Sequence, residues 1–216
     1  MKQNSVFRKE ALNALEGNWG TSVILTIVLY VVSMAISWGG MLICKPLGQA
    51  GGIVGNIISL LMLPMSFAII VAFLKIYRKE NVGVAHLFAY YKEGGVWTTM
   101  LLKAIYLILW TLLLIIPGII KYYSYAMTEF ILKDNPEMKN NAAIEKSMAM
   151  MQGKKMKLFL LDLSFIGWII LALLTLGLGF VLLVPYMYTA RAAFYEDLKA
   201  ELEAGQPEET VIKIEE

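Results

Sequence analysis

Four ionisable side chains stand inside otherwise apolar stretches of this sequence: Lys103, Glu129, Asp162 and Arg191. A charged side chain at the middle of a membrane helix costs about 2.5–3.5 kcal/mol on insertion scales, so each of the four needs a compensating role. One role is to line a polar cavity along which a substrate or an ion passes. The other is to form interhelical ion pairs that offset each other's desolvation, or to reach the membrane surface with the end of the side chain.

The turns between the apolar stretches decide which of these charges can meet. Folding the chain about the glycine-rich turn at 177–179 brings Asp162 and Arg191 to similar depths in the last hairpin. Folding the preceding hairpin about its proline brings Lys103 and Glu129 together more loosely. We favour structural ion pairing for both pairs, with a polar pathway as the alternative.

Three prolines interrupt apolar stretches and are predicted to kink their helices: Pro64, Pro117 and Pro185. A proline inside a helix frees a backbone carbonyl, which transporters use to bind ions or to bend. Kinks that improve helix packing are the more frequent use, and we favour that interpretation.

Basic residues cluster just before the last hairpin, at Lys146, Lys154, Lys155 and Lys157. A lysine near a membrane surface attracts anionic lipid headgroups by about 1 kcal/mol, so this cluster is predicted to contact them. The same residues also act as a topology determinant, because cytoplasmic loops are enriched in Lys and Arg.

The sequence contains no residue pattern typical of an enzyme active site or a metal site. Cys44 and His86 are the only residues of their kinds, and neither has partners at ligand spacing. A glycine-rich phosphate loop, a Ser/His/Asp set and a nucleic-acid-binding module are also missing from the sequence. We therefore expect no catalytic residue, cofactor, metal or nucleic acid, and the lipid bilayer is the expected partner.

Composition places these residues in a membrane. The chain has 216 residues, of which 58% are hydrophobic and 17% charged, and its mean hydropathy is +0.63. Such a chain has too few polar residues to cover the outer faces of a soluble domain. The first apolar stretch is too long for the core of a secretory signal peptide, and no Ala-x-Ala-like cleavage site follows it, so we expect a first membrane helix there. Stretches of about twenty apolar residues suffice to cross a bilayer, and we predict six spans: about 21–44, 53–77, 96–116, 119–133 (short enough to be re-entrant instead), 157–176 and 179–197.

Three amphipathic segments precede the three hairpins, at 4–18, 81–94 and 135–153. Each has apolar residues at helical spacing, and the third opens on Asn-Pro, a typical helix start. The fold class predicted is therefore an all-α membrane protein of three hairpins, each preceded by a helix lying in the cytoplasmic interface. Residues 1–200 form one domain, and 201–216 form an acidic, flexible tail. The distribution of Lys and Arg places both termini on the cytoplasmic side.

Several segments resemble an uncharacterised bacterial integral-membrane family, domain of unknown function 975. They are ALNALEGNW at 11–19, IIPGIIKYYSYAMTEFIL at 115–132, Asn135-Pro136, SMAMMQG at 147–153, LFLLDLSFIGW at 158–168, Pro185-Tyr186 and Phe194-Tyr195. The resemblance implies a bacterial protein of the cytoplasmic membrane and brings no activity or site residues with it. A looser likeness links the chain to the membrane region of some glycerophosphodiester phosphodiesterases, whose active-site pattern is missing here.

Two functions follow from these observations. The first is a non-catalytic accessory, scaffold or lipid-organising component of the membrane. The alternative is a small transporter that uses the charges inside its spans and its proline-kinked helices. The small number of polar side chains in the spans favours the first.

Overall fold

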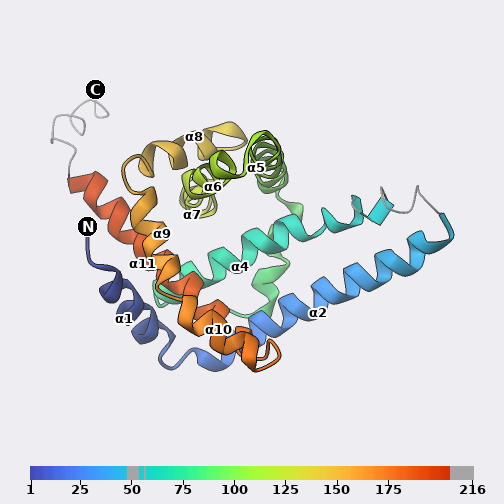
Figure 1. Ribbon diagram of the computed structural model, residues 1–216, viewed down its shortest axis with the longest axis horizontal. Coiled ribbons are helices and arrows are strands. Elements are labelled where there is room, and N and C mark those ends of the chain that lie inside the picture. The colour runs from blue at the N-terminus through green and yellow to red at the C-terminus, as the bar shows by residue number, and fades with distance from the viewer. Residues whose placement is uncertain (48–53, 56, 205–216) are drawn as a thin grey trace.

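The computed structural model describes residues 1–47, 54–55 and 57–204, and these residues form helices and connecting turns with no strand among them (Figure 1). In chain order the elements are α1 (Asn4–Leu15), α2 (Trp19–Cys44), η1 (Lys45–Leu47), α4 (Met62–Tyr77), η2 (Val84–Leu87), η3 (Ala89–Lys92), α5 (Gly94–Leu113), α6 (Ile115–Ser124), α7 (Thr128–Asp134), α8 (Asn141–Met150), α9 (Lys155–Leu163), α10 (Ile166–Leu174) and α11 (Phe180–Ala204). The three η elements are 3-10 helices. The prediction of an all-helical protein is confirmed for this part of the chain.

Four helical segments are long and apolar enough to cross a membrane: Trp19–Leu42, Ile57–Tyr77, Gly94–Leu113 and Lys155–Leu174. Half of the Ile57–Tyr77 window is buried inside the protein, against about a fifth in each of the other three. The segment that contains α4 is therefore central, while the other three present most of their apolar surface outward. Such surface is costly in water, and this indicates a membrane-embedded protein.

The remaining two predicted spans have a different form. Residues 119–133 are divided between α6 and α7, which are separated by a turn at 125–127. A ten-residue helix such as α6 extends about 15 Å, half the thickness of a bilayer core. Residues 179–197 lie almost wholly within α11, whose C-terminal half carries charge. That helix continues to Ala204, so the predicted tail begins later than expected, and its remainder lies outside the described residues, as does most of the loop after α2.

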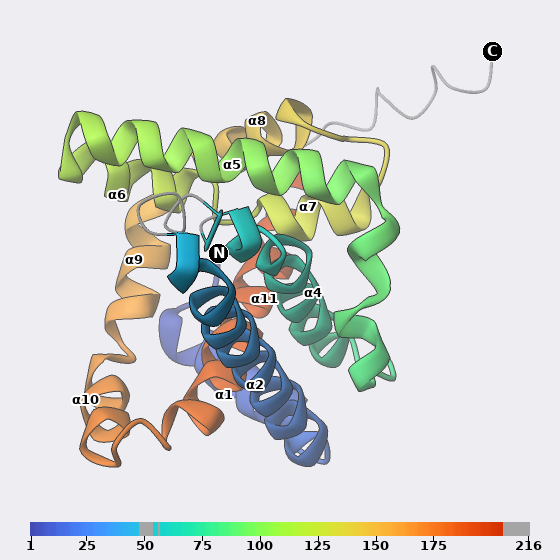
Figure 2. The same cartoon turned by 90° about the vertical axis from the view of Figure 1, so that its right-hand side faces the viewer.

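The core is built around α4 and α11, which pack against each other and against α1, α2 and α7. Helix α1 packs most extensively on α11, where the rings of Phe7 and Phe194 lie 5.4 Å apart. Figure 1 shows α2 and α4 running side by side across the molecule, whereas α5 is seen almost end-on. Figure 2 shows α5 lengthwise, so it crosses α2 and α4 at a steep angle.

The predicted interfacial helices differ from expectation. The apolar face of α1, formed by Phe7, Ala11 and Leu15, is fully buried in the protein core and does not face outward. Residues 81–94 form two 3-10 helices in place of one α-helix. The first of these helices buries Leu87 and the second buries Tyr90.

The third amphipathic segment starts later than predicted. Asn135 ends α7, where its side-chain amide donates to the carbonyl of Ile131, and α8 begins at Asn141. Proline is common just after a helix as well as at the first helical position, so Asn135-Pro136 fits either end.

The prolines also occupy distinct places. Pro64 and Pro117 are each the third residue of a helix, α4 and α6, where the missing N–H has no intrahelical partner to lose. Only Pro185 lies inside its helix, α11. The turn before α11 is the glycine-rich turn predicted from the sequence, and Gly177 has a φ of 87°, which favours glycine.

Candidate functional site

Asp162 of α9 and Arg191 of α11 form the pair that the hairpin predicted. Arg191 Nε donates to Asp162 Oδ1 at 3.0 Å, and Nη2 donates to Oδ2 at 2.7 Å, so the guanidinium grips both carboxylate oxygens. The third nitrogen, Nη1, donates to the hydroxyl of Tyr122 at 3.1 Å. The side chains of Asp162 and Arg191 are only 13% and 18% exposed, and each of the three guanidinium nitrogens donates one hydrogen bond.

Lys103 of α5 and Glu129 of α7 form the second predicted pair. Lys103 Nζ lies 2.6 Å from Glu129 Oε1, and both side chains are mostly buried. A buried charge left alone is strongly unfavourable, so this contact stabilises both residues where they stand. The structure thus brings together each of the two pairs that the sequence analysis proposed.

A third charged cluster was missed by the sequence analysis. Arg78, at the end of α4, binds Asp134 at the end of α7 through two hydrogen bonds of 2.7 Å. Its Nε also donates to Glu196 of α11 at 2.6 Å. No sequence spacing relates three positions so far apart along the chain, so the sequence did not single out these residues.

Asp134 is the most heavily coordinated carboxylate of this cluster. Besides Arg78, it accepts hydrogen bonds from Tyr195 Oη and Lys199 Nζ, each at 3.0 Å. Burial raises the pKa of Asp134, but the hydrogen bonds from Arg78 and Lys199 outweigh burial and lower its pKa to about 2. Asp134 is therefore a stable anion that ties the ends of α4, α7 and α11 together.

Of the four lysines before the last hairpin, one forms an ion pair within the described residues. Lys154 forms an ion pair with Glu201. Lys146, Lys155 and Lys157 form no ion pair with any residue in the described ranges. Contact between these three ammonium groups and lipid headgroups stays a prediction.

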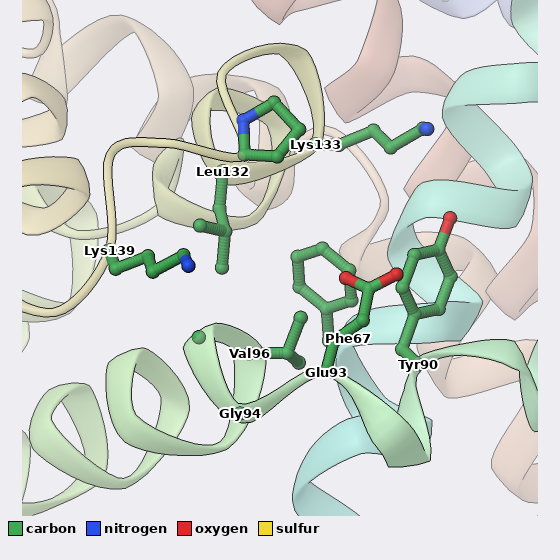
Figure 3. Close-up of a pocket in the computed structure, with 10 residues that line it drawn as sticks. Phe67, Tyr90, Glu93, Gly94, Val96, Leu132, Lys133 and Lys139 are labelled. Atoms are coloured by element: carbon green, nitrogen blue, oxygen red, sulfur yellow. The ribbon is translucent and has the colours of Figure 1, made fainter.

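Two cavities differ sharply in character. An apolar groove of about 430 Å³ lies between α10 and α11 and is bordered by α1 and the start of α2, with Leu12, Trp19, Trp168, Leu171, Leu182 and Tyr186 among its lining residues. The second cavity, of about 320 Å³, is bounded by the N-terminal end of α5, the segment after α7, and α4 (Figure 3). Its lining includes charged residues, among them Glu93, Lys133 and Lys139. Neither cavity is lined by the two predicted pairs.

No three His, Cys, Asp or Glu side chains gather to form a metal site within residues 1–47, 54–55 and 57–204. His86 instead shares a hydrogen bond of 2.9 Å with Lys75 Nζ. Burial and the neighbouring charges of Lys75 and Lys133 lower the pKa of His86, so its imidazole is neutral at pH 7. The neutral imidazole of His86 therefore accepts a hydrogen bond from the ammonium group of Lys75.

Comparison with known proteins gives one match. Residues 99–202 match the model of a family described as "Protein of unknown function (DUF975)". The matched range holds both predicted pairs, the residues Asp134 and Lys199, and most of the segments on which the resemblance was based; ALNALEGNW at 11–19 lies outside it. The resemblance is confirmed over this range. Searches of curated proteins and of solved structures return no match.

Proposed function

We propose that this protein is a non-catalytic membrane component that organises lipids around its helices. The observation that carries the proposal is that each of the four charges singled out from the sequence is used in a pair, Asp162 with Arg191 and Lys103 with Glu129. A transport pathway needs polar groups that can release one partner for a substrate. Here the bidentate contact and the burial of the side chains favour a fixed, structural role.

Apolar surface supports the lipid part of the proposal. Few side chains of α2, α5 and α10 are buried inside the protein, and in a bilayer their outward apolar surface would contact acyl chains. The groove between α10 and α11 offers a concave apolar site of the size of a lipid chain segment rather than a flat face. The aromatic side chains of Trp19 and Tyr186 border it, and such residues favour the membrane–water interface.

The same proposal includes an orientation. The ends of α4, α7 and α11 share one network of charges around Asp134. The segment before α1 also contacts α11, because the backbone N–H of Lys2 donates to Asp197 at 2.9 Å. Because Lys and Arg are concentrated at this end, we propose that it faces the cytoplasm.

A transport role is the second candidate, and one observation favours it. Pro185 cannot donate the helical hydrogen bond to Val181, and one turn later the buried hydroxyl of Thr189 has no hydrogen-bond partner in the described part of the chain. Carbonyl and hydroxyl oxygens of this kind bind cations in transporters.

One experiment separates the two functions. Purified protein would be reconstituted in phosphatidylethanolamine/phosphatidylglycerol vesicles, and retained lipid would be counted by native mass spectrometry after detergent extraction. We expect bound lipid, and we expect Leu171→Trp, which fills the groove, to reduce it. Ile170→Trp is the matched control, because Ile170 lies beside Leu171 on α10 with similar exposure but outside the groove. Proton or potassium flux through the vesicles, with lipid retention equal in both variants, would overturn the proposal in favour of transport.

A further inference from the structure

We propose that the cavity at the N-terminal end of α5 binds the headgroup of a phospholipid that carries both a phosphate and an ammonium, of the phosphoethanolamine type. This inference rests on the proposed role in organising lipids and specifies the headgroup. The cavity of about 320 Å³ lies between the residues before and at the start of α5, the segment that follows α7, and Phe67 of α4 (Figure 3).

Charges of both signs line this cavity without neutralising each other. Lys133 and Lys139 come from the end of α7 and the segment after it, and Glu93 directly precedes α5. None of the three forms an ion pair with another residue in the described part of the chain. In Figure 3, Lys139 extends toward Leu132 from one side while Glu93 rises from the other. A ligand with separated charges of opposite sign is the complement of such a site.

The start of α5 adds donors beside the lysines. The first N–H groups of this 20-residue helix, at Gly94 and Gly95, have no intrahelical partner, and no side chain caps them. A helix N-terminus favours a negative group such as phosphate. Gly95 also matters sterically, because a Cβ there would lie 2.9 Å from Lys139 Cγ. Glycine at this position lets the stem of Lys139 lie directly over the first turn of α5.

The ring of Tyr90 completes the site. Tyr90 lines the cavity with only 7% of its surface exposed, and its hydroxyl donates to no acceptor within the described residues. A ligand that accepts a hydrogen bond can therefore use this donor. The ring is held edge-on against Phe67, with centroids 4.9 Å apart, and this apolar wall suits the carbon atoms of a headgroup.

The combination of groups selects the ligand. A simple anion would approach the two lysines but meet repulsion from Glu93, and a simple cation would meet repulsion from the lysines. A phosphate placed near Lys139 and the amides of α5, with its ammonium at Glu93, satisfies both signs. The source is a membrane lipid rather than a soluble molecule, because α5 is a candidate span and the end of a span lies at the level of the headgroups.

Native mass spectrometry of the full chain with defined lipids tests this inference. We expect phosphatidylethanolamine to be retained in preference to phosphatidylglycerol. Glu93→Gln should lower phosphatidylethanolamine binding about fivefold, the effect of one charge contact near a membrane surface, and leave phosphatidylglycerol binding unchanged or stronger. Lys139→Gln should weaken both lipids. Glu137→Gln and Lys92→Gln are matched controls, since both residues are exposed neighbours outside the cavity.

A further variant, Gly95→Ala, keeps every charge and displaces the Lys139 side chain. It should reproduce part of the Lys139→Gln loss while thermal unfolding in detergent stays close to that of the wild type. Equal binding of the two lipids, or equal effects of the cavity variants and their controls, would overturn the inference. Displacement of phosphatidylethanolamine by soluble phosphoethanolamine would also overturn it, because the ligand would then be a soluble molecule and not a membrane lipid. These failures differ from that of the proposed function, which would show as loss of any dependence of lipid retention on Leu171.

Discussion

Arg78 and Asp134, 56 positions apart, meet through two parallel hydrogen bonds of 2.7 Å that join the end of α4 to the end of α7. Glu196 and Lys199 of α11 attach to the same two side chains, at 2.6 and 3.0 Å. The contact is a bidentate pair, the strongest form of charge-assisted hydrogen bond between side chains. It makes one polar cluster the point at which three helix ends are fixed.

The stability of the protein should depend on acid pH through Asp134. Its pKa falls from 3.8 to about 2 on folding, so the folded state binds a proton less readily than the unfolded chain. The stabilisation is therefore complete above about pH 5 and is lost progressively as the pH falls through 3.8 toward 2. Thermal unfolding of the detergent-solubilised protein between pH 6 and 2 measures it.

The matched variant for that titration is Asp134→Asn, which cannot titrate. It should be less stable at pH 6 and should show a shallower decline across the same pH range. Parallel curves for the two proteins would contradict the assignment of the acid dependence to this carboxylate.

The pair of Asp162 and Arg191 should behave as a structural unit. Removing one partner leaves the other charge buried alone, so Asp162→Asn and Arg191→Gln should each cost about 3–5 kcal/mol in the free energy of unfolding. The double variant should recover a large part of that loss, because neither charge then remains unpaired. Denaturant or thermal unfolding in detergent gives the four values of the cycle.

Lys2→Gln provides the comparison for this cycle. Lys2 pairs with Glu10 on the surface, and exposed pairs contribute at most about 1 kcal/mol. If the three buried-pair variants unfolded like the wild type, the charges would be kept for a purpose other than stability, and the transport candidate would gain support.

Gly118 allows α5 and α6 to pack closely against each other in their hairpin. A Cβ added to Gly118 would lie 2.6 Å from Thr111 Oγ1 and 2.9 Å from the Cα of Thr111, which is a backbone atom and cannot rotate away. Gly118→Ala should therefore destabilise the protein by about 1–3 kcal/mol. Gly20→Ala, in α2 with nothing within 4 Å of the added Cβ, should be neutral or stabilising. Equal stability of both variants would mean that the hairpin relaxes freely.

The sequence predicted the elements that long apolar stretches and strong turns determine. Four apolar helices, the hairpin turn at Gly177, and the pairs formed by Lys103 and Asp162 with their partners all follow from local pattern and hairpin geometry. The match of residues 99–202 to a family of unknown function agrees with the resemblance seen there.

What the sequence could not predict depends on tertiary contacts. The spacing of apolar residues in α1 is the same whether they face a lipid surface or α11, and the protein core takes them. Apolar residues at i and i+3 fit an α-helix and a 3-10 helix equally, so the segment at 84–92 was assigned the wrong helix type. The cavity before α5 combines residues from three separate segments, and no local pattern relates them. Only Glu93 lies next to a pattern typical of a helix boundary, the glycine pair at 94–95.

The packing of α1 on α11 also bears on the order in which the protein is made. Helix α1 is synthesised before α11, on which it packs. Arg78 is likewise synthesised before its partners Asp134 and Glu196. During that interval Phe7 and its apolar neighbours lack the surface that buries them in the finished protein. Contacts between segments so distant along the chain slow folding, and this part of the core can close only after α11 has been made. A nascent chain stalled before that helix should therefore be the form most dependent on the insertion machinery and on chaperones.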